Sequence, residues 1–394
     1  MSVVHDQEPS SSRLVSLDAF RGFTIAAMVL VNNPGDWGNL YPQLAHAEWH
    51  GWTFTDWIFP FFLFICGVSM TFSLANKRAA HPHIVEDRFA MMKSLWKRAG
   101  IIFLIGLALN FIPNFNPDTV RIPGVLQRIA LCTMLAAPIV LYFNWRAQCV
   151  WIVGLLGFYT VVMLLVPVPD IHGVVAAGVL EPGRDVGAYL DRLFLTGHMW
   201  AKSKTWDPEG LFTTIPALTS MLFGVLLGHW LARPVGHASK TVWMMMMGLL
   251  CLWIGVVIDA TFMPINKGLW TTSYAIFMTG WGLLMFAIFY WLIDGCDSAR
   301  IRAQAQKWLR PCTIFGMNAL FIFAFSGLLA KMLGFIKFTQ SDGSLLSLKA
   351  ILYAPIKALP IAAVNQSLLF AILFNLVMFF IAWIMWKKKW FIKV

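Results

Sequence analysis

Charged residues are scarce in this chain of 394 residues: Asp, Glu, Lys and Arg make up 12% of it, while 59% is hydrophobic. A soluble globular domain has about twice that share of charge. Apolar runs of roughly 18 or more residues recur along the whole length, and such runs are typical of membrane-spanning helices. The composition excludes a pair of ordinary soluble domains and predicts one polytopic membrane protein.

Cysteine is also sparse and unpatterned. The six cysteines are scattered, and no C-x-x-C or mixed Cys/His spacing brings ligands together. We therefore expect neither a zinc site nor a disulfide framework. The N-terminal apolar run carries Asp18 and Arg21 and lacks a small-residue cleavage pattern, which argues against a cleaved signal peptide.

Acidic residues are outnumbered, with 19 Asp and Glu against 30 Lys and Arg, for a net charge of +11. The basic residues gather in short loops and in the C-terminal tail K-K-K-W-F-I-K rather than on one face. The preference of cytoplasmic loops for Lys and Arg explains this excess, so nucleic-acid binding is not expected. The same preference predicts that both termini are cytoplasmic and that the loop around His46 lies on the other side.

We predict an all-α bundle of about ten transmembrane helices. The expected spans are residues 14–33, 55–76, 96–113, 124–143, 149–167, 211–231, 242–262, 272–293, 312–334 and 367–386. Residues 345–364 are apolar but interrupted by charges and by two prolines, which predicts a re-entrant or interfacial segment, with a full extra span as the alternative. Residues 1–12 are expected to be a disordered tail, and residues 13–394 a single transmembrane domain.

The loop between the first two spans, within residues 32–64, concentrates the polar chemistry. It contains Asp36, His46, Glu48, His50 and Asp56. One interpretation makes His46 a general base or nucleophile, with Asp56 orienting the imidazole. In another, both histidines are ordinary interfacial side chains. The four-residue spacing of the histidines would also suit a metal on a helix, but no third ligand is evident, so we expect no metal.

Three further polar residues near or inside the apolar runs have two interpretations each. Asn32 either donates to an oxyanion or caps the first helix. Arg128 requires a partner, either a carboxylate or a ligand phosphate. Asn318 either joins helices or contacts a ligand.

Several motifs together resemble the heparan-alpha-glucosaminide N-acetyltransferase family of transmembrane acyltransferases. They cover nearly the whole chain in order: S-L-D-A-F-R-G-F-T (16–24), V-N-N-P-G (31–35), H-A-E-W-H-G-W-T-F-T-D (46–56), F-P-F-F-L-F-I-C-G-V-S (59–69), V-R-I-P-G-V-L-Q-R (120–128), Y-L-D-R-L (189–193), D-P-E-G (207–210), P-I-N-K-G-L-W-T-T-S-Y (264–274) and G-M-N (316–318).

The resemblance implies transfer of an acetyl group from cytoplasmic acetyl-CoA, across the bilayer, to the amino group of a glucosamine-type sugar. The family's active histidine corresponds to His46, and its nearby asparagine and aspartate correspond to Asn32 and Asp56. The absence of a large N-terminal lumenal domain implies a bacterial member in the inner membrane, acting on a periplasmic amino sugar or cell-wall fragment. A homodimer is compatible with this assignment.

Acetyl transfer to an amine requires a base, an oxyanion donor and an aligned thioester. Direct attack by the amine is the preferred route, with acetyl-histidine as the alternative. The phosphates of coenzyme A are expected at cytoplasmic cations. The candidates are Lys93, Lys97, Arg98, Arg302 and Arg310.

The pantetheine arm must then reach His46 through a passage between helices, and we expect Arg128 and Asn318 to line it. The competing hypothesis is a membrane transporter of a sugar or cell-wall fragment. The polytopic form of the chain and the interrupted segment 345–364 fit a transporter, but the sequence shows no paired broken helices.

Overall fold

The computed structural model describes residues 14–80, 88–340 and 343–392, with backbone only for 76–80. The predicted tail at residues 1–12 lies outside these ranges. The chain is 69% helical with almost no sheet, which confirms the all-α prediction.

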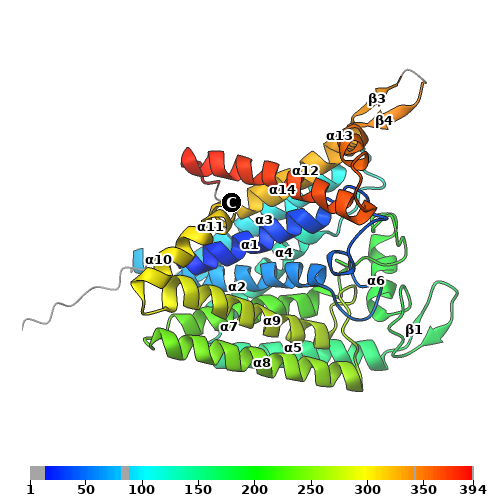
Figure 1. Cartoon of the computed structure of the whole chain (residues 1–394). Coiled ribbons are helices and arrows are strands. Elements are labelled where there is room, and N and C mark those ends of the chain that lie inside the picture. Colours follow the sequence, from blue (N-terminus) through cyan, green and yellow to red (C-terminus); the bar gives the residue numbers. More distant parts are fainter. Residues whose placement is uncertain (1–13, 81–87, 341–342, 393–394) are drawn as a thin grey trace, which may run out of the picture.

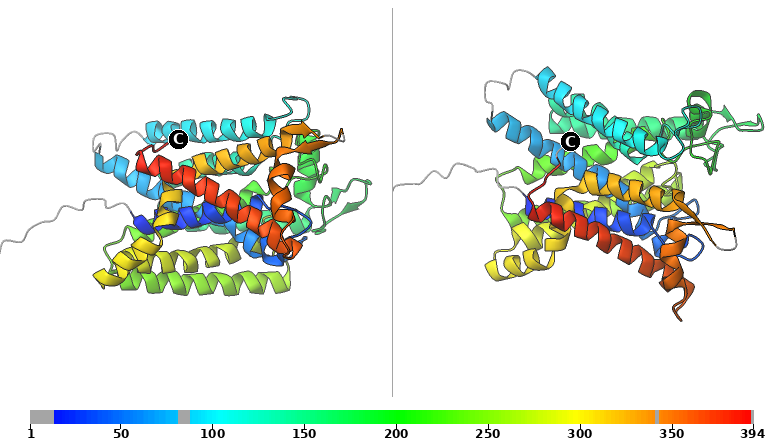
Figure 2. Two further views of the ribbon diagram at one scale, coloured as in Figure 1. Left: turned by 45° about the horizontal axis from the view of Figure 1, so that its top comes forward. Right: turned by 90° about the horizontal axis from the view of Figure 1, so that it is seen from above.

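The long helices run side by side along one direction, as Figures 1 and 2 show. They are α1 (Val15–Asn32), α2 (Phe54–Ala80), α3 (Arg88–Phe111), α4 (Val125–Tyr142), α5 (Trp145–Leu165), α7 (Thr214–Leu231), α8 (His237–Thr261), α9 (Thr272–Tyr290), α12 (Ala319–Phe335) and α14 (Ala363–Lys387). Among the described residues, nine helices are long and apolar enough to cross a membrane, or ten if the bent pair described below is one span. This agrees with the expected count.

Shorter elements cap the two ends of the bundle. They are a 3-10 turn η1 (Pro42–Leu44), β1 (Val168–Pro169), β2 (Val175–Ala176), α6 (Val186–Leu195), a π-helical turn η3 (Trp291–Gly295), α10 (Ala299–Trp308), α11 (Arg310–Met317), β3 (Lys337–Thr339), β4 (Leu345–Ser347) and α13 (Leu348–Lys357). The strands form two antiparallel hairpins, β1–β2 and β3–β4. We call the end with α6 and both hairpins the loop end, and the end with α10 and residues 388–392 the tail end (Figure 1).

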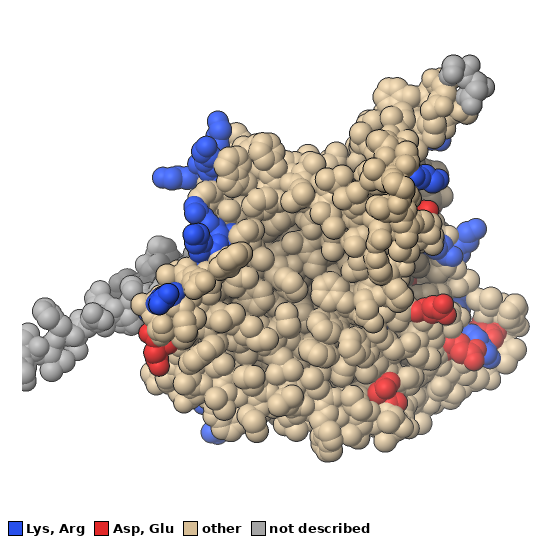
Figure 3. All heavy atoms as spheres, in the orientation of Figure 1, with Lys and Arg blue, Asp and Glu red and all other residues tan. Residues whose placement is uncertain are grey.

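The helices form an inner and an outer group. Between 67% and 72% of the apolar window of α1, α2, α4 and α7 is buried, against 22–33% for α3, α5, α8 and α14. In Figure 3, a broad band without charged side chains separates two ends where Lys, Arg, Asp and Glu gather. An apolar belt around buried helices is the surface that a bilayer requires.

Glycines allow the inner helices to approach closely. A Cβ atom on Gly22 of α1 would lie 1.6 Å from the carbonyl oxygen of Cys312, and one on Gly316 of α11 would lie 1.9 Å from that of Asp18. The α2–α7 crossing repeats this arrangement, because a Cβ on Gly67 would lie 1.9 Å from the carbonyl oxygen of Met221. Small residues at such contacts bring backbones together where van der Waals packing has to hold helices in lipid.

Replacing Gly22 by alanine is therefore expected to destabilise the protein. The added methyl group must push α1 away from α11, and overpacking of this kind costs about 1–3 kcal/mol. Gly154→Ala in α5 is a matched control, since its Cβ would meet nothing within 4 Å. In detergent, the thermal unfolding midpoint should be clearly lower for Gly22→Ala than for wild type and should not fall for Gly154→Ala. Equal midpoints for the two variants would contradict the close contact.

The predicted span 312–334 is not one straight helix. The segment is two helices, α11 and α12, bent by 81° at Asn318. Asn318 has non-helical backbone angles, and its side-chain amide donates to the carbonyl of Trp390 (3.0 Å) and accepts from the N–H of Ile392 (3.0 Å). The end of the chain thus satisfies polar groups at the break, which hydropathy alone could not indicate.

Residues 345–364 do not form an extra span. Only ten of them, Leu348–Lys357, are helical in α13, and ten helical residues are about 15 Å long, half the hydrocarbon thickness. The first three residues of the segment form β4, and α13 directly follows the β3–β4 hairpin at the loop end (Figure 1). Its length excludes the alternative of a full span and agrees with an interfacial or re-entrant piece.

Candidate active site

Residues 33–53, which connect α1 to α2, fold onto the loop end of the bundle. The N–H of Gly51 donates to the carbonyl of Ile265 (2.7 Å), and the indole N–H of Trp49 donates to that of Leu180 (2.7 Å). The side-chain oxygen of Gln43 accepts from the N–H of Phe54 (3.1 Å). Two distant parts of the chain, together with the first residue of α2, therefore fix this loop.

His46 and Asp56 form a direct pair in this loop. Nδ1 of His46 lies 2.7 Å from Oδ1 of Asp56, whose side chain is 1% exposed while that of His46 is 51% exposed. The other oxygen of Asp56, Oδ2, accepts from the N–H groups of Ala47 (3.1 Å) and Thr53 (3.0 Å). The tyrosine hydroxyl of Tyr274 donates to the backbone carbonyl of Asp56 (2.7 Å). The carboxylate is thus held by its surroundings, while the imidazole reaches the surface.

This pairing determines the tautomer of His46. An ionised carboxylate only accepts hydrogen bonds, so Nδ1 of His46 must carry the hydrogen that it shares with Asp56. The neutral ring then has its lone pair on Nε2. An unprotonated ring nitrogen on a half-exposed side chain is what a general base or a nucleophile requires.

Lys267, in the connection between α8 and α9, completes the group; sequence reasoning noted Asn266 and Lys267 beside the spans but gave Lys267 no role. Its Nζ atom lies 3.0 Å from Nδ1 and 3.4 Å from Nε2 of His46, and 3.4 Å from Oδ1 of Asp56. Burial lowers the pKa of the Lys267 amine, while Asp56 and Glu209 favour its charged form. The only available signal was the motif P-I-N-K-G at 264–268.

Asn266 fixes the backbone beside Lys267. Its buried side chain donates to the carbonyl of Trp49 (2.9 Å) and accepts from the N–H of Leu269 (2.9 Å). Its own N–H donates to the hydroxyl of Thr271 (3.0 Å). Trp270, with φ of +52°, makes a tight turn just before α9. Lys267 is therefore presented to His46 by a connection that is itself bonded to the His46 loop.

Asn32 is not part of this contact group. It is the exposed last residue of α1, and none of the hydrogen bonds described between residues 14–392 joins it to His46. The residue that caps the C-terminal end of α1 is the neighbouring Asn33, whose side-chain amide donates to the carbonyl of Val29 (2.7 Å).

Arg128 lies buried at the loop end, at the start of α4. Its guanidinium donates to the carbonyl of Gly210 (3.0 Å) and to the hydroxyl of Thr213, and it lies over the Trp270 ring at 5.3 Å. Its Nε and Nη1 atoms have no partner within the described chain. The partners of Arg128 are thus a carbonyl and a hydroxyl of the segment before α7, together with an aromatic ring.

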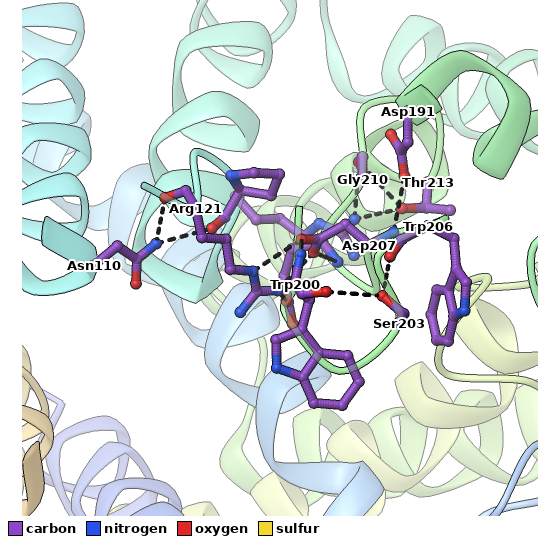
Figure 4. A network of polar contacts seen from close by, with 12 residues as sticks. Asn110, Arg121, Asp191, Trp200, Ser203, Trp206, Asp207, Gly210 and Thr213 are labelled. Atoms are coloured by element: carbon purple, nitrogen blue, oxygen red, sulfur yellow. Dashed lines mark hydrogen bonds and ion pairs between the residues drawn. The ribbon is translucent and has the colours of Figure 1, made fainter. Parts of the chain in front are cut away.

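Arg121 and Asp207 pin the long segment between α5 and α7 to the bundle (Figure 4). Arg121 donates from Nε and Nη2 to the two oxygens of Asp207 (2.8 and 2.6 Å), and also to Glu209. Burial opposes the charge of Arg121, but the two carboxylates hold its pKa above the usual value. Asn110 of α3 donates to the carbonyl of Arg121 (2.9 Å). This network binds the connection after α3 to the segment before α7.

Asp191 of α6 joins the same network and predicts a pH effect on stability. Its oxygens accept from the N–H groups of Leu211 (3.0 Å) and Asp207 (3.1 Å), and burial raises its pKa to about 6. The folded protein keeps this proton up to about pH 6, while the unfolded chain loses it near the ordinary aspartate pKa of 3.8. The contribution of Asp191 to the free energy of unfolding is therefore present at low pH and is lost as the pH rises through about 6.

Between pH 5 and 7 this loss is about 1 kcal/mol. Asp191→Asn should flatten the dependence of the thermal midpoint on pH in that range, because it removes one titrating group. Asp170→Asn, at an exposed turn, is the control and should leave the slope between pH 5 and 7 unchanged. A variant at residue 191 with the wild-type slope would contradict the assignment.

The remaining predicted contacts of coenzyme A lie away from His46. Lys97 and Arg98 are exposed on α3, and Arg310 begins α11, its guanidinium 4.7 Å from the Trp386 ring centre. Asn318 is bound to the end of the chain, as described above. These cations lie toward the tail end, whereas His46 lies at the loop end.

The structure shows a small cavity near the loop end, of about 10 Å³, which is room for roughly one water molecule. Leu30, Tyr41, Leu44 and Ser367 are among its lining residues, and His46 is not. Within the described residues, no group of three or more His, Cys, Asp or Glu side chains is arranged to hold a metal ion.

The apolar helices identify an integral membrane protein, and its most chemically equipped site is the His46–Asp56–Lys267 group at one end of the bundle. A model of the family described as "Heparan-alpha-glucosaminide N-acetyltransferase, catalytic" matches residues 13–257, and the chain belongs to this family.

Two curated relatives carry the name heparan-alpha-glucosaminide N-acetyltransferase. The relative from Homo sapiens is 28% identical, over 72% of this chain and 49% of its own. The relative from Mus musculus is 27% identical, over 72% of this chain and 50% of its own. The chain therefore spans about half the length of the curated relatives it matches.

Proposed function

We propose that this protein is a transmembrane N-acetyltransferase. It takes an acetyl group from acetyl-CoA and transfers it to the amino group of a glucosamine-type sugar, with His46 as the base. The observation that carries the proposal is the 2.7 Å contact between Nδ1 of His46 and buried Asp56, which leaves the Nε2 lone pair of the half-exposed ring without a hydrogen. Membership of the family supplies the reaction class and the acceptor class.

In the reaction, the lone pair of the sugar amine attacks the carbonyl carbon of the thioester. The amine proton passes to Nε2 of His46, the carbon–sulfur bond breaks, and the thiolate of coenzyme A leaves. The thiolate takes the proton from the imidazolium, which returns His46 to its neutral form. Asp56 keeps the imidazole oriented and stabilises the imidazolium that forms. Asn32 keeps its proposed role as oxyanion donor. The alternative route, in which Nε2 first accepts the acetyl group, uses the same geometry.

In this proposal, acetyl-CoA enters from the tail end. Lys97, Arg98 and Arg310 would hold the phosphates of coenzyme A, with Lys93 and Arg302 as further candidates. Arg128 would line the path of the pantetheine arm, whereas Asn318 could do so only after releasing Trp390 and Ile392. The helices must part to open this path. The tail end then faces the cytoplasm of a bacterial inner membrane, with both termini inside, and a homodimer is compatible with this arrangement.

The proposal is tested with purified protein, acetyl-CoA labelled in the acetyl group, and glucosamine. Labelled N-acetylated sugar should accumulate with time and with protein concentration. Absence of product with glucosamine and with amino-sugar fragments of the cell wall, in protein that binds acetyl-CoA, would overturn it.

A transporter is the second candidate, because the helix broken at Asn318 resembles the interrupted helices that bind substrates in transporters. Here, however, Trp390 and Ile392 of the same chain occupy the polar groups of Asn318. Uptake of labelled amino sugar into vesicles without any acetylation would favour the transporter.

A further inference from the structure

Lys267 contacts the imidazole of His46 in an unusual way. Its Nζ atom is almost as close to Nε2 (3.4 Å) as to Nδ1 (3.0 Å). The hydrogen of Nδ1 already points to Asp56, so Nδ1 has no lone pair to offer the ammonium. The ammonium therefore lies against the ring as a charge, within reach of the Nε2 lone pair, and forms an ion pair with Oδ1 of Asp56 (3.4 Å).

A positive charge at this distance acts on the protonation of His46. The ammonium disfavours a second positive charge on the ring, whereas Asp56 favours it. Glu209 acts on the amine of Lys267 as a further negative charge, and Glu48 is exposed on the loop of His46 itself. Because Lys267 has 22% of its side chain exposed, its charge is only partly screened by water.

We propose that Lys267 is a positioning residue that keeps His46 neutral, with Nε2 unprotonated, and supplies positive charge beside the reacting group. It offsets Asp56, so that the ring stays oriented by the carboxylate without being held as an imidazolium. As negative charge develops on the carbonyl oxygen of the thioester, a fixed ammonium nearby stabilises it. This role rests on the proposed acetyl transfer, but its effect on His46 exists without any substrate.

The test therefore measures the protonation of His46 directly. Diethyl pyrocarbonate acylates neutral imidazole, and peptide mass spectrometry can follow its reaction at His46 against pH. Lys267→Met and Lys267→Gln remove the charge, Lys267→Arg retains it, and Lys202→Met removes an exposed cation that lies over the Trp37 ring. Thermal midpoints identify which variants are folded.

The neutral variants should need a higher pH for the same fraction of reactive His46, by about one pH unit. The acid limb of acetyl transfer should move with it. Lys267→Arg and Lys202→Met should stay within about 0.3 pH units of wild type. If the pH at which half of His46 reacts with diethyl pyrocarbonate is unchanged in folded Lys267→Met or Lys267→Gln, the role of Lys267 is overturned, whatever the activity.

The two proposals fail differently. Suppose that wild-type protein produces no N-acetyl sugar but the pH midpoint of His46 acylation moves in Lys267→Met. The proposed function is then lost and the electrostatic role of Lys267 stands. If acetyl transfer occurs and the midpoint does not move, the enzyme stands and the role of Lys267 is lost. Equal loss of activity in Lys267→Met and Lys267→Arg, with unmoved midpoints, would leave Lys267 as a structural contact only.

Discussion

Replacing His46 by alanine is expected to reduce acetyl transfer by about 10²–10⁴-fold, the usual contribution of a positioned general base. Removal of the ring also takes the 2.7 Å partner from Oδ1 of buried Asp56, which costs about 1–3 kcal/mol of stability, so the thermal midpoint is measured beside the rate. The measurement is the rate of N-acetyl sugar formation under saturating acetyl-CoA. If His46 is instead the nucleophile, the loss will be at least as large and an acetylated His46 peptide will appear in wild-type protein without acceptor.

His50→Ala is the matched control for this variant. His50 lies in the same loop and is exposed, and Nδ2 of Asn266 is 3.4 Å from its Nδ1 atom. Its loss should change the rate by less than about threefold, because no proton transfer depends on it. Comparable rates for His46→Ala and wild type would remove His46 from the mechanism.

Asp56→Asn is expected to have the second largest effect, through the tautomer. An asparagine can accept from Ala47 and Thr53 with its oxygen only if its NH₂ group faces Nδ1 of His46. The amide then donates to Nδ1, so the ring hydrogen moves to Nε2 and the base is lost. Turnover should fall by about 10²–10⁴-fold, while the KM for the sugar changes little.

Asp36→Asn provides the control for the removal of a carboxylate from this loop. Asp36 accepts from the N–H of Gly38 (2.9 Å) and from Asn39 (2.7 Å), which makes it a local turn residue. Its substitution should leave turnover near the wild-type value. A folded Asp56→Asn protein with normal turnover, or with an effect confined to KM, would show that Asp56 does not orient the base.

The sequence predicts most of the bundle because long apolar runs leave few alternatives in a membrane. Boundaries differ mainly where polar residues extend a helix, as at Arg88 of α3, eight residues before the predicted start. The break at Asn318 was not predictable from local pattern. It depends on hydrogen bonds to Trp390 and Ile392, more than 70 residues further along the chain.

The site was predictable only where its residues are close together in the sequence. His46 and Asp56 are ten residues apart, and one loop can bring them together. Lys267 is 221 residues from His46, and only the packing of the α8–α9 connection against that loop joins them. Arg128 was correctly expected to need partners, but these are a carbonyl, a hydroxyl and a tryptophan ring from segments that follow it.

The central claim is that an acetyl group supplied at the tail end is used by His46 at the loop end. The most direct measurement reconstitutes the protein in sealed vesicles with glucosamine trapped inside and labelled acetyl-CoA added outside. We predict labelled N-acetylglucosamine inside the vesicles, and none with His46→Ala. Product that forms only when donor and acceptor share one compartment would contradict the account.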